Sequence, residues 1–162
     1  VKEGYTIVQS FEYVLVMILA QLPGYLVAAW LVEKLGRKAT LAGFIGMCAL
    51  SAYFFGQSDN VTQIVVWGCL MSFFNLGAWG VLYTYTPEQY PANIRAFGSG
   101  WAGAIGRIGG IFAPFAVTHM MVLDHGFSYV FMMFTAVLIA VALIILVLGE
   151  ETKGKTLESI GL

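Results

Sequence analysis

Long apolar runs alternate with short polar links along almost the whole chain. A transmembrane helix needs about 20 mostly apolar residues, and five runs meet this need: 11–32, 39–55, 61–83, 97–121 and 127–148. The links between them are too short for a soluble domain, and a polar tail follows at 150–162. The pattern predicts an all-α integral membrane protein, with one transmembrane domain of five helices over 1–162.

Composition supports this class of protein. Hydrophobic residues make up 59% of the chain and charged residues 10%, and the mean hydropathy is +0.82, far from the soluble average. The net charge of -1 comes without a basic patch, so nothing indicates a nucleic-acid partner. Cys48 and Cys69 lie inside apolar runs, and we expect buried small side chains rather than a redox pair.

Basic residues are distributed unevenly between the two sides of the predicted helices. One side has Lys2 alone, whereas six basic residues fall on alternate links and the tail: Lys34, Arg37, Lys38, Arg95, Lys153 and Lys155. Since cytoplasmic loops carry the excess of Lys and Arg, we expect a multi-pass cell-membrane protein with its C-terminus cytoplasmic and the N-terminus of this segment outside. An odd number of helices with an outward start agrees with a chain that has lost earlier helices.

Arg107 is the only formally charged residue of the glycine-rich run 97–121. At 1.5 Å per residue it lies about 15 Å from Phe97, near the expected bilayer midplane. No acidic residue of the chain is expected at that depth, because Glu12 falls near the outer end of its run. Ionisable groups inside a membrane usually mark a substrate pathway, and a guanidinium suits a carboxylate. An absent helix, water or a carbonyl could also be its partner.

A few other polar groups interrupt the apolar runs. Gln21 stands beside Pro23, and Ser72, Asn75 and Trp79 share one helical face because they follow at i, i+3 and i+7. This face could line a cavity with a hydroxyl, an amide and an aromatic plane. Hydrogen bonding between helices and an interfacial aromatic belt explain the same residues equally well.

Glycines crowd the fourth predicted helix. The run Gly98–Gly103 matches GxGxxG, but no strand precedes it, so nucleotide binding is rejected. Gly106 and Gly110 form a GxxxG pair that a neighbouring helix could approach closely, and Pro114 would kink the helix. These features suit a helix that bends during gating, although ordinary packing explains them almost as well.

Metal and proton chemistry have few candidates. His119, Asp124 and His125 cluster near the outer end of the fourth helix, but without a defined ligand spacing they are expected to be exposed polar groups. We therefore predict no metal and no cofactor. Coupling to protons would need a titratable group near the transport path, for which Glu12 and His119 are weak candidates.

Three charged motifs lie on the expected cytoplasmic side: Glu33-Lys34-Leu35-Gly36-Arg37-Lys38, then Pro87-Glu88-Gln89-Tyr90-Pro91 with Arg95, and the tail run Glu150-Glu151-Thr152-Lys153-Gly154. The first resembles a loop of the major facilitator superfamily, with Glu33 where Asp is usual. The second is similar to the Glu-x-aromatic-Pro loop of its sugar-porter branch. The third is similar to that branch's tail signature, with Glu150 replacing Pro.

This resemblance implies a place for the chain in a larger protein. It would form helices eight to twelve of a twelve-helix transporter, most of the C-terminal half, with the N-terminal half missing. Within the branch, the run 102–111 around Arg107 looks like the bacterial niacin and aromatic-acid transporters. Such a protein would move an organic anion such as nicotinate, with proton symport by alternating access.

The resemblance and the residues together assign roles to the candidate site. Arg107 would bind the carboxylate, Trp79 would contact the ring, and Asn75 and Gln21 would supply hydrogen bonds. A hexose transporter of the same superfamily is the alternative within the class, and a non-transporting membrane scaffold is the alternative outside it. An enzyme is not expected, because no nucleophile–base pair or metal triad occurs at membrane depth.

Charged residues of the three motifs could form a latch at the cytoplasmic ends of the helices. The members would be Glu33, Arg37, Glu88, Arg95 and Glu151, with Gly36 and Lys38 in the same motif. Breaking such a latch would open an inner gate. The plain alternative is a set of solvated loop charges, whose ion pairs are worth about 0–1 kcal/mol each.

Overall fold

The computed structural model describes residues 7–122 and 126–154, and side chains over 11–121 and 127–154. These residues form six α-helices: α1 (Ile7–Leu19), α2 (Gln21–Leu35), α3 (Arg37–Gly56), α4 (Val61–Glu88), α5 (Arg95–Val122) and α6 (Gly126–Leu148). The described part of the chain contains no strand. The all-helical class is therefore confirmed.

The first predicted helix is interrupted. A turn at Ala20 separates α1 from α2. Pro23 explains the position of the break, because a proline lacks an N–H and its ring clashes with the carbonyl four residues earlier, which belongs to Leu19. The prediction of one continuous helix over 11–32 was wrong in this detail, although the two pieces together still form one candidate membrane span, Phe11–Leu35.

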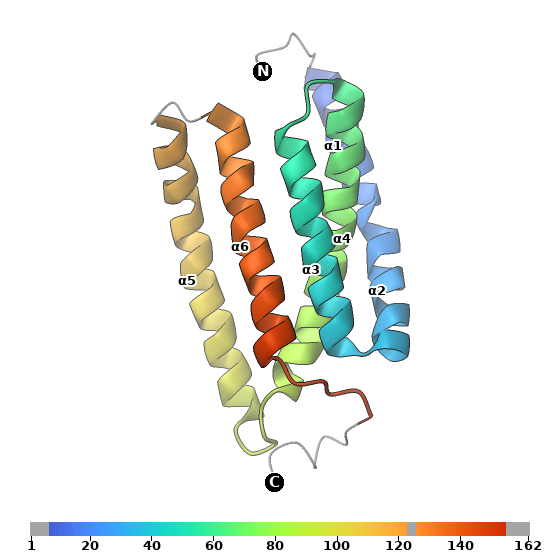
Figure 1. Cartoon of the computed structure of the whole chain (residues 1–162), viewed down its shortest axis with the longest axis vertical. Helices are drawn as coiled ribbons and strands as arrows, with labels where there is room; N and C mark the ends of the chain where they lie inside the picture. Colours follow the sequence, from blue (N-terminus) through green and yellow to red (C-terminus); the bar gives the residue numbers. More distant parts are fainter. Residues whose placement is uncertain (1–6, 123–125, 155–162) are drawn as a thin grey trace.

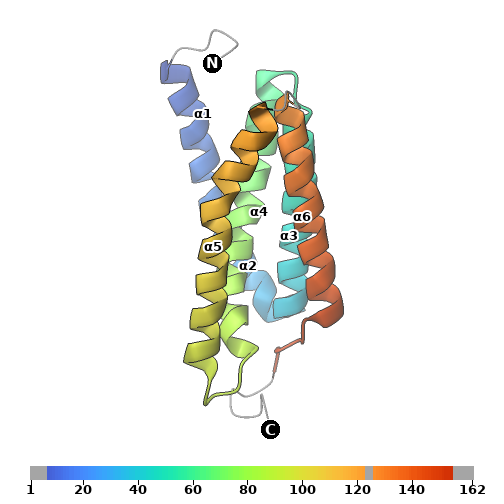
Figure 2. The same cartoon turned by 90° about the vertical axis from the view of Figure 1, so that its left-hand side faces the viewer.

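Four segments of the described chain are long and apolar enough to cross a membrane: Phe11–Leu35, Arg37–Gly56, Val61–Glu88 and Phe127–Leu148. Helix α5 is not among them. Its 28 residues give a length of about 42 Å, which is sufficient for a bilayer. Figure 2 shows it running beside α6 along the bundle. Its glycines and Arg107 lower its hydropathy below that of the four candidate spans.

Helix α3 is central to the packing. It packs mainly against α6 and α4, and α4 packs in turn against α2 (Figure 1). The buried core lies between these helices and consists of Ala28, Leu41, Phe44, Ile45, Ala78, Val81, Tyr85 and Ala142. Ala49 and Ala52 of α3 are buried as well. Gly43 and Gly46 contribute no close contact, because an added Cβ at either would meet nothing within 4 Å.

Two helices present large surfaces that the chain leaves uncovered. Apolar side chains of α6 such as Val147 and Leu148 are mostly exposed, as expected for a surface facing lipid. On α5, an added Cβ at any of five glycines would meet nothing within 4 Å: Gly100, Gly103, Gly106, Gly109 and Gly110. The expected close approach of a neighbour to these glycines is therefore not made by any described helix of this chain. Helix α5 continues through Pro114.

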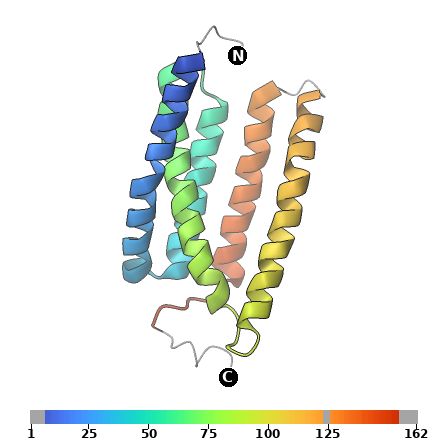
Figure 3. The ribbon, with the colours of Figure 1, turned by 180° about the vertical axis from the view of Figure 1, so that it is seen from behind.

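The three charged motifs meet at one end of the bundle. Figure 1 shows the ends of α2, α4 and α6 and the starts of α3 and α5 at its lower edge, opposite the N-terminus. We call this the motif end, formed by residues 33–38, 87–95 and 149–154. Helices α4 and α5 are close together at the motif end and diverge away from it (Figures 1 and 3).

Candidate functional site

A cleft of about 580 Å³ lies between α4 and α5. Its α4 wall is bulky, and its α5 wall consists mainly of small residues. The lining residues are Trp79, Leu82, Tyr83, Thr86 and Pro87 from α4, and Ser99, Ala102, Gly103, Gly106, Arg107 and Gly110 from α5. Each set follows helical spacing, so one face of each helix forms the cleft.

Arg107 is the only charged residue that lines this cleft. Its side chain is exposed. Within residues 7–122 and 126–154, no hydrogen bond or ion pair involves its guanidinium, and the single ion pair there joins Arg37 to Glu88. The described helices therefore leave the positive charge available to a group from outside the chain.

Trp79 lines the same cleft, and 45% of its surface is exposed. Neither Asn75 nor Gln21 belongs to the lining. Asn75 is exposed on α4, one turn further from the motif end, and Gln21 is half-buried where α2 begins. Of the four predicted binding residues, the structure thus brings Arg107 and Trp79 together. The binding roles of all four remain predictions.

Tyr83 and Ser99 line the cleft, although they were not assigned to a binding site from the sequence. Tyr83 follows Trp79 by one helical turn, and the two ring centroids are 5.5 Å apart. The sequence held this signal, because an i+4 position lies on the same face. Ser99 also lines the cleft, and its Oγ is buried without a hydrogen-bond partner among the described residues. Its position within the GxGxxG match gave no indication of this role.

At the motif end, Glu151 caps the start of α3. Its Oε1 accepts a hydrogen bond from the backbone N–H of Arg37 at 2.9 Å, and its Oε2 accepts one from that of Lys38 at 3.2 Å. The first N–H groups of a helix lack partners within the helix, and negative charge is stabilised at that end. Glu151 therefore binds the helix terminus rather than the Arg37 guanidinium.

The side chain of Arg37 contacts a different carboxylate. Its Nε lies 3.3 Å from Oε2 of Glu88 at the end of α4, but the geometry is that of an ion pair and not of a hydrogen bond. Thr152, which is buried, donates its hydroxyl to the same oxygen of Glu88. Glu88 thereby joins the start of α3 to the segment that follows α6.

Further side chains at the motif end donate hydrogen bonds to backbone carbonyls. Lys153 Nζ donates to the carbonyl of Lys34 in the last turn of α2 at 2.6 Å, and Tyr85 donates its hydroxyl to the carbonyl of Glu150 at 2.8 Å. Arg95 Nε donates to the carbonyl of Pro87 at 3.1 Å. Carbonyls at helix C-termini lack partners within the helix, so these cations complete the hydrogen bonding there.

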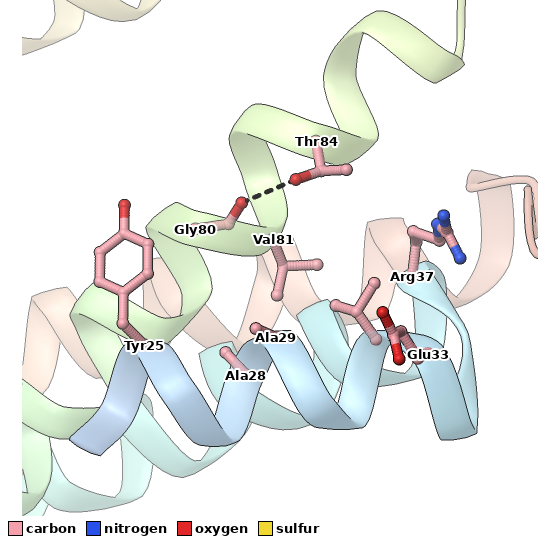
Figure 4. Close-up of a pocket in the computed structure, with 9 residues that line it drawn as sticks. Tyr25, Ala28, Ala29, Glu33, Arg37, Gly80, Val81 and Thr84 are labelled. Carbon is pink, nitrogen blue, oxygen red and sulfur yellow. Dashed lines mark hydrogen bonds between the residues drawn. The ribbon is translucent and has the colours of Figure 1, made fainter. Parts of the chain in front are cut away.

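The predicted latch residues lie together at the motif end, and the structure shows which groups they contact. Arg37 and Glu88 form an ion pair, whereas Glu151 and Arg95 bind backbone groups. Glu33 lines a second cavity, of about 330 Å³ between α2 and α4, together with Arg37. Figure 4 shows both residues at one end of this cavity and Tyr25 at the other. Lys38 donates its backbone N–H to Glu151. Gly36 precedes α3 with a backbone φ of 97°.

The remaining candidates for metal or redox chemistry stay apart from the cleft. His119 is exposed on α5, while Asp124 and His125 lie outside the described residues. Among the described residues, no group of three or more His, Cys, Asp or Glu could hold a metal ion. Cys48 is buried and Cys69 half-buried, and neither is bonded to the other.

Comparison with known proteins identifies the family of the chain. The model of the Major Facilitator Superfamily matches residues 8–161. The Niacin transporter NiaP of Acinetobacter baylyi is 79% identical over 162 residues, which are 100% of this chain and 37% of that protein. A candidate niacin/nicotinamide transporter NiaP of Bacillus subtilis is 56% identical over 157 residues, 96% of this chain and 39% of that protein.

A more distant relative is the Organic cation/carnitine transporter 7 of Arabidopsis thaliana, 30% identical over 155 residues, 91% of this chain and 29% of that protein. The chain spans well under half the length of each of these relatives. That coverage agrees with the expectation of a part of a larger protein. These relatives are all named as transporters.

Proposed function

Because the chain belongs to the major facilitator superfamily, we propose that the whole protein is a secondary active transporter of a small aromatic carboxylate such as nicotinate. The name of the Acinetobacter baylyi relative, 79% identical to this chain, supports niacin as the substrate. In secondary transporters the substrate site lies near the bilayer midplane between repeated halves, and rocking exposes it to each side in turn. The half that completes the site is supplied by the rest of the protein.

One observation carries the proposal: the cleft between α4 and α5 holds a single charged residue, Arg107, with Trp79 on the opposite wall. A planar guanidinium binds a carboxylate through two parallel hydrogen bonds, and an indole offers a flat apolar surface to a ring. The described chain offers Arg107 no carboxylate of its own. An aromatic acid supplies both the anion and the ring that this arrangement accepts.

We place the motif end in the cytoplasm on the distribution of basic residues. The N-terminus of this segment then lies outside. Uptake of an anion against a membrane potential that is negative inside costs about 2.3 kcal/mol per elementary charge per 100 mV. Symport with a proton removes this cost, so we propose proton-coupled uptake. Neither Glu12 nor His119 lines the cleft, and the proton carrier is assigned to the remainder of the protein.

The contacts at the motif end act in this proposal as the inner latch. They join the ends of α2, α3 and α4 to the segment after α6. A network of this kind can bias an equilibrium between two conformations by a few kcal/mol. The hexose alternative receives less support from the cleft, whose lining offers three hydroxyl groups, from Tyr83, Thr86 and Ser99, among mainly apolar residues.

Uptake by the full-length protein tests the proposal. Proteoliposomes with an inward proton gradient should accumulate radiolabelled nicotinate, and Arg107→Ala should abolish this uptake. Inhibition by nicotinamide, which lacks the charge, should be much less affected by the same change. An equal loss for both compounds would contradict the assigned role of Arg107. Uptake of hexoses but not of aromatic acids would favour the alternative substrate, and no transport at all would favour a scaffold.

A further inference from the structure

Tyr83 and Trp79 form an aromatic surface on the α4 side of the cleft. The two rings are inclined by 35° with centroids 5.5 Å apart, and both line the cleft between α4 and α5. Tyr83 is 68% exposed, although it is a large aromatic residue. Its hydroxyl makes no hydrogen bond with any residue of the described ranges. Neither packing nor hydrogen bonding within the described chain thus accounts for its position.

Tyr85 gives the contrast on the same helix. Tyr85 follows Tyr83 by two residues and therefore lies on the opposite side of α4. It is 6% exposed and donates its hydroxyl to the carbonyl of Glu150. It therefore has the contacts expected of a structural tyrosine. Tyr83 has none of them and instead extends the surface of Trp79 towards the motif end.

The opposite wall determines what this surface can receive. Facing the two rings, α5 presents Gly103 and Gly106 beside the guanidinium of Arg107. Glycine has no side chain, so the space between the walls is bounded by two aromatic side chains on one side and mainly by backbone on the other. Such a slot admits a flat ring more readily than a puckered one, and aromatic pairs gain energy beyond their buried area.

We propose that Tyr83 determines specificity for aromatic over saturated carboxylates by forming, with Trp79, the wall on which the substrate ring stacks. The inference rests on the proposed function, because it takes the carboxylate to be held by Arg107. It adds Tyr83 to the residues that bind the substrate. In this view the shape of the ring is recognised separately from the charge of the carboxylate. An interfacial tyrosine that contacts only lipid would not influence this selection.

The test compares two acids that carry the same carboxylate on a six-membered ring, benzoate and cyclohexanecarboxylate, as inhibitors of nicotinate uptake by the full-length protein in proteoliposomes. Tyr83→Leu should raise the inhibition constant of benzoate about twofold to tenfold and leave that of cyclohexanecarboxylate within about twofold. Tyr83→Phe should retain the preference for benzoate. Tyr85→Phe serves as the control and should leave the preference unchanged.

Each other outcome overturns the inference. Equal increases for both acids in Tyr83→Leu indicate a structural role, and no change for either indicates that Tyr83 lies away from the substrate. Tyr83→Met replaces Tyr83→Leu if the latter does not reach the membrane. If the wild type transports no anion, the proposed function fails and this inference with it. If Arg107→Ala removes inhibition by both acids while Tyr83→Leu keeps the ring preference, only the role of Tyr83 fails.

Discussion

Gly36 leaves the space that the carboxylate of Glu151 occupies. A Cβ atom on Gly36 would lie 2.5 Å from Oε2 of Glu151, and the backbone at Gly36 has a φ of 97°. Both constraints favour glycine, since other residues rarely adopt this backbone conformation. The glycine of the first motif and the acid of the tail are therefore parts of one contact at the start of α3.

Gly36→Ala should destabilise the motif end and impair transport. The substitution forces a Cβ against the Glu151 carboxylate and strains the backbone, each at a cost of about 1 kcal/mol or more. Thermal unfolding of the purified protein measures the stability, and nicotinate uptake measures the function. Gly154→Ala is the matched control, because Gly154 also has a positive φ, 77°, but has nothing within 4 Å of an added Cβ. A loss as large in Gly154→Ala would show that the contact with Glu151 contributes little.

Exchanging the charges of Glu151 and Arg37 should not restore transport that is lost when Glu151 is replaced. Its oxygens accept hydrogen bonds from backbone N–H groups, and the loss of such a helix cap typically costs about 0.5–2 kcal/mol. Glu151→Ala should therefore slow turnover, and Arg37→Glu combined with Glu151→Arg should not restore it. Rescue by that double variant would show that an ion pair, and not the cap, is the functional contact.

For Arg37 and Glu88, by contrast, exchanging the two charges should restore part of the transport. Their side chains are 26% and 14% exposed and lie 3.3 Å apart, so the charges interact directly. A double-mutant cycle with Arg37→Ala and Glu88→Ala should give a coupling free energy of about 1 kcal/mol in thermal or denaturant unfolding. The exchanged pair, Arg37→Glu with Glu88→Arg, should recover part of the turnover that either single reversal removes. Strict additivity of the two alanine variants would contradict a direct interaction.

Thr152 should stabilise the network through Glu88. Its side chain is 4% exposed and donates to the Glu88 carboxylate. Thr152→Val keeps the shape but removes the donor, and a buried acceptor that loses a partner costs about 1–3 kcal/mol. The melting temperature should fall, whereas Thr152→Ser should retain most of the stability. Equal melting temperatures for Thr152→Val and the wild type would exclude this hydrogen bond as a stabilising contact.

The sequence predicted the helices well because lipid imposes a simple rule. A run long enough to cross a bilayer must satisfy its backbone hydrogen bonds internally, so the apolar runs located α3, α4 and α6 closely. Pro23 lies close to Gln21 in the first apolar run, but the break at Ala20 depends on the clash of the proline ring with the carbonyl of Leu19, which apolarity does not reveal. The distribution of charges likewise predicted that the three motifs lie on one side of the membrane, and they lie at one end of the bundle (Figure 1).

The pairings within the site depended on geometry that the sequence does not contain. The charges of the latch residues did not reveal their individual partners, and Glu151 binds backbone N–H groups because α3 begins directly beside it. Asn75 and Trp79 share a helical face over one turn, but only Trp79 lies where α4 and α5 are close enough to form the cleft. Thr152 carries no charge and so gave no signal of its contact with Glu88.

The glycines of α5 distinguish a cleft from a packing surface. Gly106 lines the cleft and Gly109 does not, and an added Cβ at either would meet nothing within 4 Å. Gly106→Leu should therefore fill the cleft and abolish nicotinate uptake without lowering the melting temperature, because leucine also favours the helix by about 0.8 kcal/mol over glycine. Gly109→Leu should retain most of the uptake. If both variants lose uptake and stability together, the glycine face packs against the rest of the transporter, and the cleft is not the path of the substrate.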